Sequence, residues 1–406
     1  METMDLNTFV NQRWFLHKNN SIQKGNIVHQ FDLSDEYAFC VFAFYLDSGK
    51  RVLYGYPMVK NRVDLDLMNY PEHHALFMNA LFQKKIWSGG NATLKIHYYD
   101  QEAFEKPFEN SIKQNLEQSN SSILFQGGRF LKWFRFLNAG EHPEVEMGVF
   151  LQLHHSKDTA KILAHISYDV NGEYYVVGVI ESALPFEKIA WDYFGENPSE
   201  EKAYLLGTQL ASLHQTLLAM EGEFKNRENN RLEVYWNAFQ ANLKQSESQL
   251  QGRSLEAAKR ILSKWSLIEE YVKSLEQVSF LAPVSRIHGD LHLGQILYKK
   301  DQFYFIDFEG EPIIPLNERR EKRSVLFDVA CMIRSFRYAK AFFKRSSSAA
   351  LELAFLKGYG VESSDELRFF LFQKTLYEAS YELNSRPDWF YIPAEDLLNH
   401  VLTNQL

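Results

Sequence analysis

The stretch Ile287-His288-Gly289-Asp290-Leu291-His292-Leu293-Gly294-Gln295, followed by Phe305-Ile306-Asp307-Phe308-Glu309-Gly310, decides the fold expected for this chain. Asp290 follows a His-Gly pair, Gln295 comes five positions later, and Asp307 opens a D-F-x-G turn. A carboxylate such as Asp290 accepts the proton of an attacking hydroxyl. The oxygens of Gln295 and Asp307 are hard ligands of the kind that Mg²⁺ prefers. The pattern predicts a general base beside a divalent cation.

This order and spacing are typical of the catalytic loop and metal segment of kinases. Short strands at 286–287 and 303–306, joined by a turn near 299–301, are expected to place Asp290 and Asp307 at the same end of the hairpin. A surface loop with chance acids is the alternative, and three polar groups in kinase order disfavour it. The sequence therefore predicts phosphoryl transfer with ATP and Mg²⁺.

Longer blocks resemble bacterial maltokinases. The main block runs from Arg286 to Tyr338; it includes DFEGEP and PLNERR (315–320), and it ends within the run FDVACMIRSFRYA (327–339). Shorter similar segments are NQRWF (11–15), EQSNSS (117–122), and YEL with RPDW (381–389). Two departures bear on the choice of sugar: Ser182 to Phe194 lacks the family's Gly- and Trp-rich pattern, and Trp14-Phe15 continues as Leu-His-Lys instead of with glycines.

The resemblance implies a protein-kinase-like, aminoglycoside-phosphotransferase-like bilobal α+β fold. Residues 1–100 would form a β-rich cap subdomain, 101–183 a β-rich N-lobe, and 184–406 a mainly helical C-lobe with the catalytic and sugar-binding sites. The implied reaction is transfer from ATP, with Mg²⁺, to the anomeric hydroxyl of maltose, giving maltose 1-phosphate and ADP. A trehalose synthase is the partner that the resemblance suggests.

Composition excludes several other classes. The 406 residues carry a formal net charge of −8, which gives no electrostatic footprint for nucleic acid. Cys40 and Cys331 are the two cysteines, so a disulfide framework is not expected. Residues 1–10 lack a secretory pattern, and no apolar run approaches the roughly 18 residues of a membrane span. A cytoplasmic protein without a membrane partner is expected.

Before the catalytic block the pattern favours strands. Tyr37 to Leu46 and Arg51 to Met58, around Asp47-Ser48-Gly49, predict a β-hairpin. Ser119, Asn120, Ser121 and Ser122 form a polar turn that is expected to surround phosphate oxygens. Lys132, between apolar neighbours on a strand, is expected to meet the phosphates of ATP, with an exposed edge lysine as the alternative.

The partner expected for Lys132 is Glu146, with Glu144 and Glu141 as competitors in a charged first helical turn. The strand 174–180 ends at Glu181-Ser182-Ala183, where backbone atoms of Glu181 and Ala183 are expected to meet adenine.

The remainder is predicted to be helical. Leu206, Leu210, Leu213 and Leu217 place a core helix at 201–220, and His214 on it is expected to be structural. Residues 232–277 predict two helices broken near Gly252, with no role assigned. Asp328 opens a helix, and the resemblance implies that its carboxylate binds the catalytic-loop backbone. His288 is expected to fix the same loop.

The resemblance places His292, Arg319, Lys374, Glu378 and Tyr381 at the sugar. The last three share one face of a late helix with Glu382, which is equally the pattern of a solvated face. Aromatic backing is expected from Trp389, Phe390 and Tyr391, whose alternative role is core packing.

Two other functions stay open. Glucosamine kinases and aminoglycoside phosphotransferases resemble this fold, but cationic aminosugars favour an acceptor site richer in carboxylates than Lys374 and Arg319 suggest. A noncatalytic pseudokinase subunit of a trehalose synthase assembly would be expected to lose Asp290, Gln295 or Asp307, and all three are present.

Overall fold

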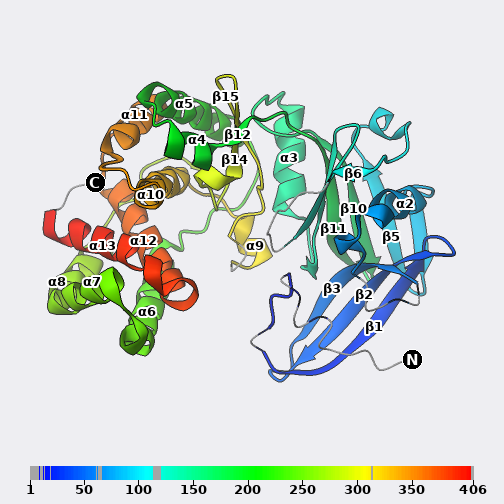
Figure 1. Cartoon of the computed structure of the whole chain (residues 1–406), viewed down its shortest axis with the longest axis horizontal. Helices are drawn as coiled ribbons and strands as arrows, with labels where there is room; N and C mark the ends of the chain where they lie inside the picture. The colour runs from blue at the N-terminus through cyan, green and yellow to red at the C-terminus, as the bar shows by residue number, and fades with distance from the viewer. Residues whose placement is uncertain are drawn as a thin grey trace. The chain divides into compact units, whose positions relative to one another are not determined.

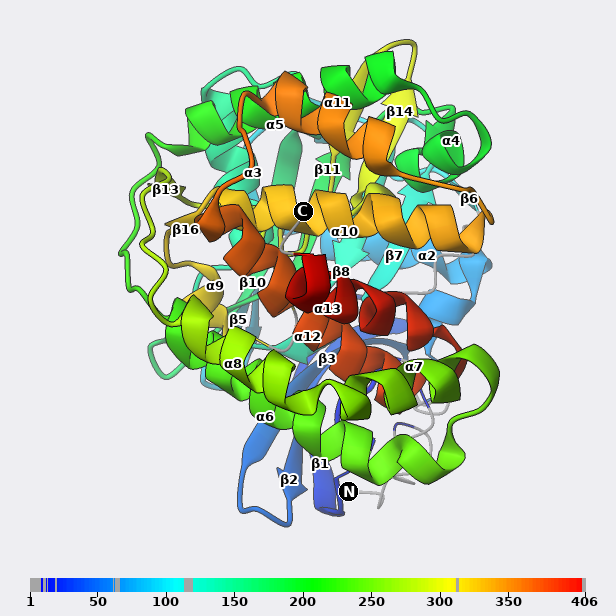
Figure 2. The ribbon, with the colours of Figure 1, turned by 90° about the vertical axis from the view of Figure 1, so that its left-hand side faces the viewer.

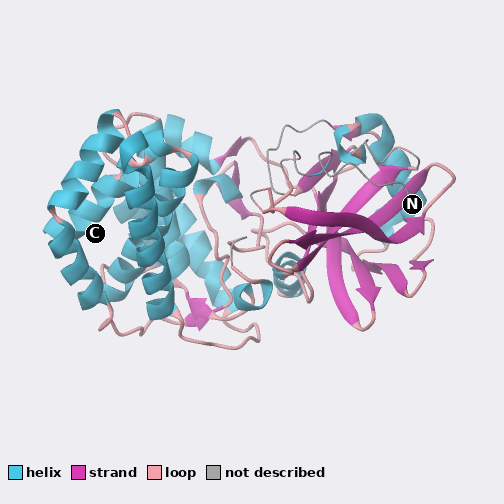
Figure 3. Ribbon diagram, turned by 90° about the horizontal axis from the view of Figure 1, so that it is seen from below, coloured by secondary structure: helices cyan, strands magenta, loops and turns pink. Residues whose placement is uncertain are grey.

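A computed structural model of the chain describes residues 9, 12, 14–18, 20–60, 62, 66–112, 120–311 and 314–403. The chain divides into two compact units, Met1–Pro185 and Phe186–Leu406 (Figure 1). Strands dominate the first unit and helices the second (Figure 3). The expected α+β class, β-rich first and helical afterwards, is confirmed. Among the described residues, no helix combines the length and hydrophobicity needed to cross a membrane.

The first unit is built on two antiparallel sheets. A seven-stranded sheet has the order β4-β5-β10-β11-β8-β7-β6, and a four-stranded sheet has the order β1-β2-β3-β9. The elements of this unit are β1 (Ile22–Asp32), β2 (Tyr37–Leu46), β3 (Arg51–Val59), α2 (Pro71–Leu81), β4 (Ile86–Gly89), β5 (Ala92–Tyr98), β6 (Ser111–Ile112), β7 (Ser121–Phe125), β8 (Arg129–Trp133), β9 (Phe136–Leu137), α3 (Pro143–Leu153), β10 (Ile162–Val170) and β11 (Glu173–Ser182).

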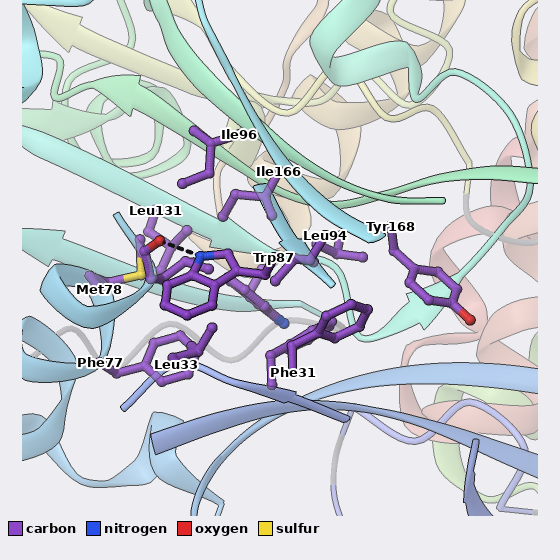
Figure 4. Close-up of a cluster of buried hydrophobic side chains, with 14 of the residues drawn as sticks. Phe31, Leu33, Phe77, Met78, Trp87, Leu94, Ile96, Leu131, Ile166 and Tyr168 are labelled. Carbon is purple, nitrogen blue, oxygen red and sulfur yellow. Dashed lines mark hydrogen bonds between the residues drawn. The ribbon is translucent and has the colours of Figure 1, made fainter. Parts of the chain in front are cut away.

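Strand β2 is buried on both faces, which explains its nearly continuous apolar sequence. Phe39 and Val41 on one face enter a core shared with α2 and the larger sheet. In that core the indole N–H of Trp87 donates to the carbonyl of Leu81 at 2.9 Å (Figure 4). Aromatic residues on the other face of the strand, such as Phe42, pack against Phe9 and its neighbours. The predicted hairpin of β2 and β3 is confirmed.

The segment predicted as a separate cap shares both sheets with the segment predicted as the N-lobe. Strand β5 pairs with β10 from Tyr98↔Ala164 to Ala92↔Val170, and β3 pairs with β9 at Leu53↔Leu137. Cross-strand contacts therefore run continuously across residue 100.

A buried ion pair connects distant parts of this unit. Nη2 of Arg135 lies 2.7 and 2.8 Å from the two carboxylate oxygens of Asp66, and the Arg135 side chain is fully buried. The indole N–H of Trp14 donates to the same carboxylate at 2.9 Å, and the Arg135 guanidinium lies 4.7 Å from the centroid of its ring. The two charges compensate each other away from water.

The second unit packs its helices in layers. In Figure 2, α10 runs between the α5 and α11 pair on one side and the group formed by α12, α13, α6, α7 and α8 on the other. The helices are α4 (Ala190–Glu196), α5 (Glu200–Leu217), α6 (Glu228–Ser246), α7 (Gly252–Ser263), α8 (Trp265–Leu275), α9 (Leu316–Arg319), α10 (Leu326–Phe342), α11 (Ala349–Tyr359), α12 (Asp365–Ser385) and α13 (Tyr391–Thr403).

Helix α5 confirms the expected core helix near 201–220. The two helices predicted for 232–277 are three in the structure, because Lys264 adds a second interruption between α7 and α8. Small two- and three-stranded sheets complete the unit: β12 (Lys188–Ile189), β13 (Val284–Ser285), β14 (Ile296–Lys299), β15 (Gln302–Phe305) and β16 (Arg323–Ser324).

Replacing Asp66 with Ala should destabilise the chain by about 3–5 kcal/mol, because it leaves the buried Arg135 guanidinium without its counter-charge. Urea unfolding followed by tryptophan fluorescence measures the loss, and Asp35→Ala at an exposed position is the control. A loss below about 1 kcal/mol for Asp66→Ala would contradict the role given to this ion pair.

Candidate active site

The loop that carries Asp290 is fixed by a buried carboxylate. Asp328 lies in the first turn of α10 and is fully buried. Its Oδ2 accepts a hydrogen bond from the backbone N–H of His288 at 2.8 Å, and its Oδ1 accepts one from that of Gly289 at 3.0 Å. Both oxygens of one rigid acceptor therefore hold the two residues before Asp290. The role expected for Asp328 is confirmed.

A histidine on α5 holds Asp328 in turn. Nε2 of His214 lies 3.1 Å from Oδ2 of Asp328, and its Nδ1 lies 2.7 Å from the hydroxyl of Tyr359. Burial would raise the pKa of the Asp328 carboxyl, but the hydrogen bond and charge of His214 and the N–H of Gly289 hold it below its usual value. The carboxylate therefore stays ionised. His214 is a buried histidine with partners on both ring nitrogens, as expected.

His288 joins this loop to the segment that carries Asp307. Its Nε2 donates to the carbonyl of Ile306 at 2.9 Å, and its ring lies 4.9 Å from that of Phe308, centroid to centroid. Gly289 has a φ of +81°, and a Cβ there would stand 3.5 Å from the Cα of Gly310. The loop-fixing role expected for His288 is confirmed.

The two predicted metal ligands lie next to each other. Nε2 of Gln295 donates to Oδ2 of Asp307 at 2.6 Å. Gln295 ends a short 3₁₀ turn, Leu293–Gln295, and Asp307 has a φ of +69° just beyond β15. One carboxylate and one amide are a small set of hard oxygen donors, which suits Mg²⁺ when phosphate oxygens and water complete its octahedron. The residues present fit this ion.

The β14–β15 hairpin explains why these two residues meet. Ile296 pairs with Phe305, and the N–H of Ile306 donates to the carbonyl of Gln295 at 3.1 Å. The predicted turn lies at Lys300-Asp301, both with positive φ, as a tight two-residue hairpin turn needs. The strand predicted at 286–287 is wrong: β14 is the partner of β15, and β13 pairs instead with β16.

A buried charge network stands beside Asp290. Nζ of Lys374 donates to Oε1 of Glu311 at 2.5 Å and lies 3.6 Å from Oδ1 of Asp290. Oε2 of Glu311 accepts from the hydroxyl of Tyr235 at 3.3 Å. Burial would lower the pKa of Lys374, but the charges of Glu311 and Asp290 help raise it well above its usual value. The ammonium therefore stays charged.

Glu311 and Tyr235 are residues that the sequence prediction missed. The signal for Glu311 was its place in DFEGEP, two residues after Glu309. Tyr235 lies on α6, whose amphipathic pattern gave no sign of a polar contact with this block.

Two predicted sugar residues support the backbone of this site. Nδ1 of His292 accepts from the N–H of Gly294 at 3.0 Å and so caps the turn that carries Gln295. Nη1 of Arg319 donates to the carbonyl of Glu309 at 3.0 Å. Contact of either side chain with a sugar stays a prediction.

The residues predicted to share one face of α12 have different partners. Lys374 points to Asp290, whereas the carboxylate of Glu378 binds Nη2 of Arg334 on α10 at 2.6 Å. Tyr381 is exposed, and Phe390 is fully buried in the core. The structure brings Lys374 to the loop that carries Asp290 and places Glu378 in a different ion pair.

In the first unit, Lys132 forms the ion pair expected of a strand lysine. Its Nζ lies 3.2 Å from Oε2 of Glu144 on α3, and both side chains are buried. The preference for Glu146 is therefore corrected to Glu144. Two residues along a helix turn through about 200°, so the two acids face opposite ways, and Glu146 is only half-buried. The apolar pattern of α3 gave no way to choose the face.

The predicted phosphate loop is described in part. Ser119 lies outside the described residues, and Asn120 directly precedes β7. Ser121 and Ser122 are not a turn, because they pair in β7 with Trp133 and Lys132 of β8. Cross-strand pairing has outweighed the turn preference of serine.

The side chain of Ser121 and the predicted hinge also have partners. The Ser121 hydroxyl accepts from Nε of Arg135 at 2.9 Å. Glu181 belongs to β11, opposite Phe130, and the N–H of Ala183 donates to the carbonyl of Gly128 at 2.7 Å. Contact of Glu181 or Ala183 with adenine stays a prediction.

Glu144→Gln should lower stability by about 3 kcal/mol, because it leaves the charge of Lys132 buried without its carboxylate. Glu146→Gln is the matched control on the same helix and should cost less than about 1 kcal/mol, since its side chain reaches solvent. Thermal unfolding of both variants distinguishes the two carboxylates. Equal losses would contradict the assignment of Glu144.

Comparisons with known proteins agree with this geometry. Residues 187–370 match the model of the phosphotransferase enzyme family. A glucosamine kinase of Mycolicibacterium smegmatis is 30% identical over 131 residues, covering 27% of this chain and 33% of that protein. A glucosamine kinase of Streptacidiphilus jiangxiensis is 26% identical over 132 residues, covering 27% and 30%. The match thus spans about a third of the length of these relatives.

Solved structures extend the likeness of the fold over the whole chain. One crystal form of a glucosamine kinase has a TM-score of 0.71 at 15% identity and covers 98% of this chain and 97% of its own. A glucosamine kinase in complex with glucosamine, ADP and inorganic phosphate has a TM-score of 0.66 at 16% identity, covering 98% and 99%. The region 187–370, which holds the loop of Asp290 and the paired Gln295 and Asp307, is therefore similar to the phosphotransferase enzyme family, and the whole chain shares its α+β fold with these glucosamine kinases.

Proposed function

We propose that this chain is an ATP-dependent sugar kinase in which Asp290 is the general base. The observation that carries the proposal is the loop before Asp290, held by Asp328 and His288 next to the Gln295 and Asp307 pair. Phosphoryl transfer asks mainly for positioning and charge neutralisation. A rigid loop with a carboxylate beside two hard ligands meets both needs.

Each residue has a defined task in this proposal. Asp290 accepts the proton of the acceptor hydroxyl and orients its oxygen. Lys374, with its charge balanced by Glu311, stands 3.6 Å from Oδ1 of Asp290 and helps to position that carboxylate. Gln295 and Asp307 would hold Mg²⁺, which neutralises phosphate charge when bound. Lys132, oriented by Glu144, would bind nucleotide phosphates in the first unit.

Maltose and glucosamine are the two acceptors that observations favour. The proposal of maltose is supported by the sequence blocks that resemble maltokinases. The same resemblance suggests a trehalose synthase as partner. The proposal of glucosamine is supported by the comparisons, because glucosamine kinases are among the proteins similar to this chain in sequence and among those similar in fold. The electrostatic objection to an aminosugar is weaker than the sequence suggested, because Glu311 neutralises Lys374 and Arg319 donates to a backbone carbonyl.

A substrate panel separates these possibilities. The protein is incubated with Mg·ATP and maltose, glucose, trehalose, glucosamine or kanamycin, and ³¹P NMR identifies the products. We expect one sugar to have by far the highest kcat/KM, because a pocket built for one pattern of polar groups leaves them unpaired with another. A maltose product should be acid-labile, as an anomeric phosphate is. If Mg·ATP binds but none of the sugars is phosphorylated, the proposal of a sugar kinase is refuted.

Two variants separate the base from the metal ligand. Asp290→Asn should lower kcat by about 10² to 10⁴ and leave Mg·ATP affinity nearly unchanged, because the base contacts the acceptor. Asp307→Ala should abolish Mg²⁺-dependent ATP binding as well as turnover, because it removes the charged ligand. Calorimetry and initial rates measure both. Asp290→Asn turning over within about tenfold of the parent would exclude Asp290 as the base.

A further inference from the structure

A cavity lies in the helical unit, and its lining includes none of Asp290, Gln295, Asp307, His292, Arg319 and Lys374; Tyr391 is the one lining residue that was expected to back a sugar. Its volume is about 420 Å³, within the range of small-molecule sites. Its walls come from α7, α10, α13, the start of α11 and the segment before it. Three carboxylates line it. Five cationic side chains also line it: Arg253, Arg337, Lys340, Lys344 and Arg345.

The carboxylates of this cavity are already bound by arginines. Glu352 binds Arg337 at 2.9 Å, and Glu395 binds Arg253 at 3.1 Å. The third carboxylate, Asp396, binds the buried Arg334 of α10. The lining acids therefore offer no spare negative charge to the remaining cations.

Two ammonium groups are left over. Arg345 donates to the backbone carbonyls of Gly195 and Glu196 at 2.8 and 3.0 Å. For the ammonium groups of Lys340 and Lys344 no hydrogen bond or ion pair is found within the part of the chain that the structure describes. Uncompensated ammonium groups at one cavity attract an anion.

The start of α11 adds donors at the same place. Ser347, Ser348 and Ala349 line the cavity, and α11 runs for 11 residues from Ala349. The hydroxyl of Ser348 donates to Glu352 at 2.6 Å and does not cap the helix, whereas the Ser347 hydroxyl accepts from the N–H of Ala349 at 3.1 Å, so the donors for a ligand are the N–H groups that follow Ala349. The first N–H groups of a helix, with the positive end of its dipole, favour phosphate.

A buried histidine is an independent sign of a ligand. His400 on α13 lines the cavity with 2% of its surface exposed, and among the residues that the structure describes neither of its ring nitrogens has a hydrogen-bond partner. Burial and the charges of Arg337, Arg334 and Arg368 lower its pKa to about 3, so the ring is neutral with one donor and one acceptor. Buried polar atoms nearly always have partners, so an orphaned pair points to a group that binds there.

We propose that this cavity binds a small phosphate-bearing molecule, whose phosphate is held by Lys340, Lys344 and the first turn of α11, with His400 at the buried end. The shared chemistry is a phosphate dianion, supplied either as free phosphate or as the monoester of a sugar.

Calorimetric titration of the full chain with inorganic phosphate and with glucose 1-phosphate tests the site. Saturable binding of at least one probe is expected, and Lys340→Ala/Lys344→Ala should weaken it by at least about tenfold, because two charge-assisted contacts are lost. Lys259→Ala/Lys273→Ala is the matched control: it removes two exposed lysines that do not line the cavity and should bind like the parent.

The NMR signals of the His400 imidazole test whether the phosphate binds in this cavity. These signals, assigned with His400→Gln, should shift during the phosphate titration of the parent and stay unchanged in the double lysine variant. Tighter binding of glucose 1-phosphate than of phosphate would identify a sugar phosphate as the ligand, and equal binding would identify phosphate itself. Absence of saturable binding by both probes, or equal affinity in the parent and the double lysine variant, would overturn the proposal.

Discussion

The candidate active site depends on the carboxylate of Asp328. Its two oxygens bind the N–H groups of His288 and Gly289, and His214 binds it from α5. Each buried N–H left without an acceptor would cost about 1–3 kcal/mol. One side chain thus joins two helices to the loop on which the proposed chemistry rests.

The part of the site that the sequence predicted is local. Gln295 and Asp307 come together because a hairpin with a two-residue turn separates them, and spacing along the chain is enough to define such a turn. Asp290 stands five residues before Gln295, so its position is also set by spacing along the chain. The left-handed Lys300 and Asp301 lie where the polar turn was expected.

The part that the sequence did not predict depends on contacts between distant segments. Lys374 and Glu311 are 63 residues apart, and nothing in either local pattern identifies the other as its partner. The choice between Glu144 and Glu146 is set by which face of α3 meets β8, and both faces carry an acid. Ser121 and Ser122 have turn-like side chains, yet the register of β7 against β8 makes them a strand.

The pairing of β5 with β10 gives the N-terminal segment a protective role. Strand β10 is buried at eight of its nine positions, and β5 covers its edge from Ala164 to Val170. Without β5, that edge would present a long apolar strand with unpaired backbone groups, a surface prone to aggregation between chains. The segment before residue 100 therefore protects the edge of β10 from pairing with the strands of other molecules.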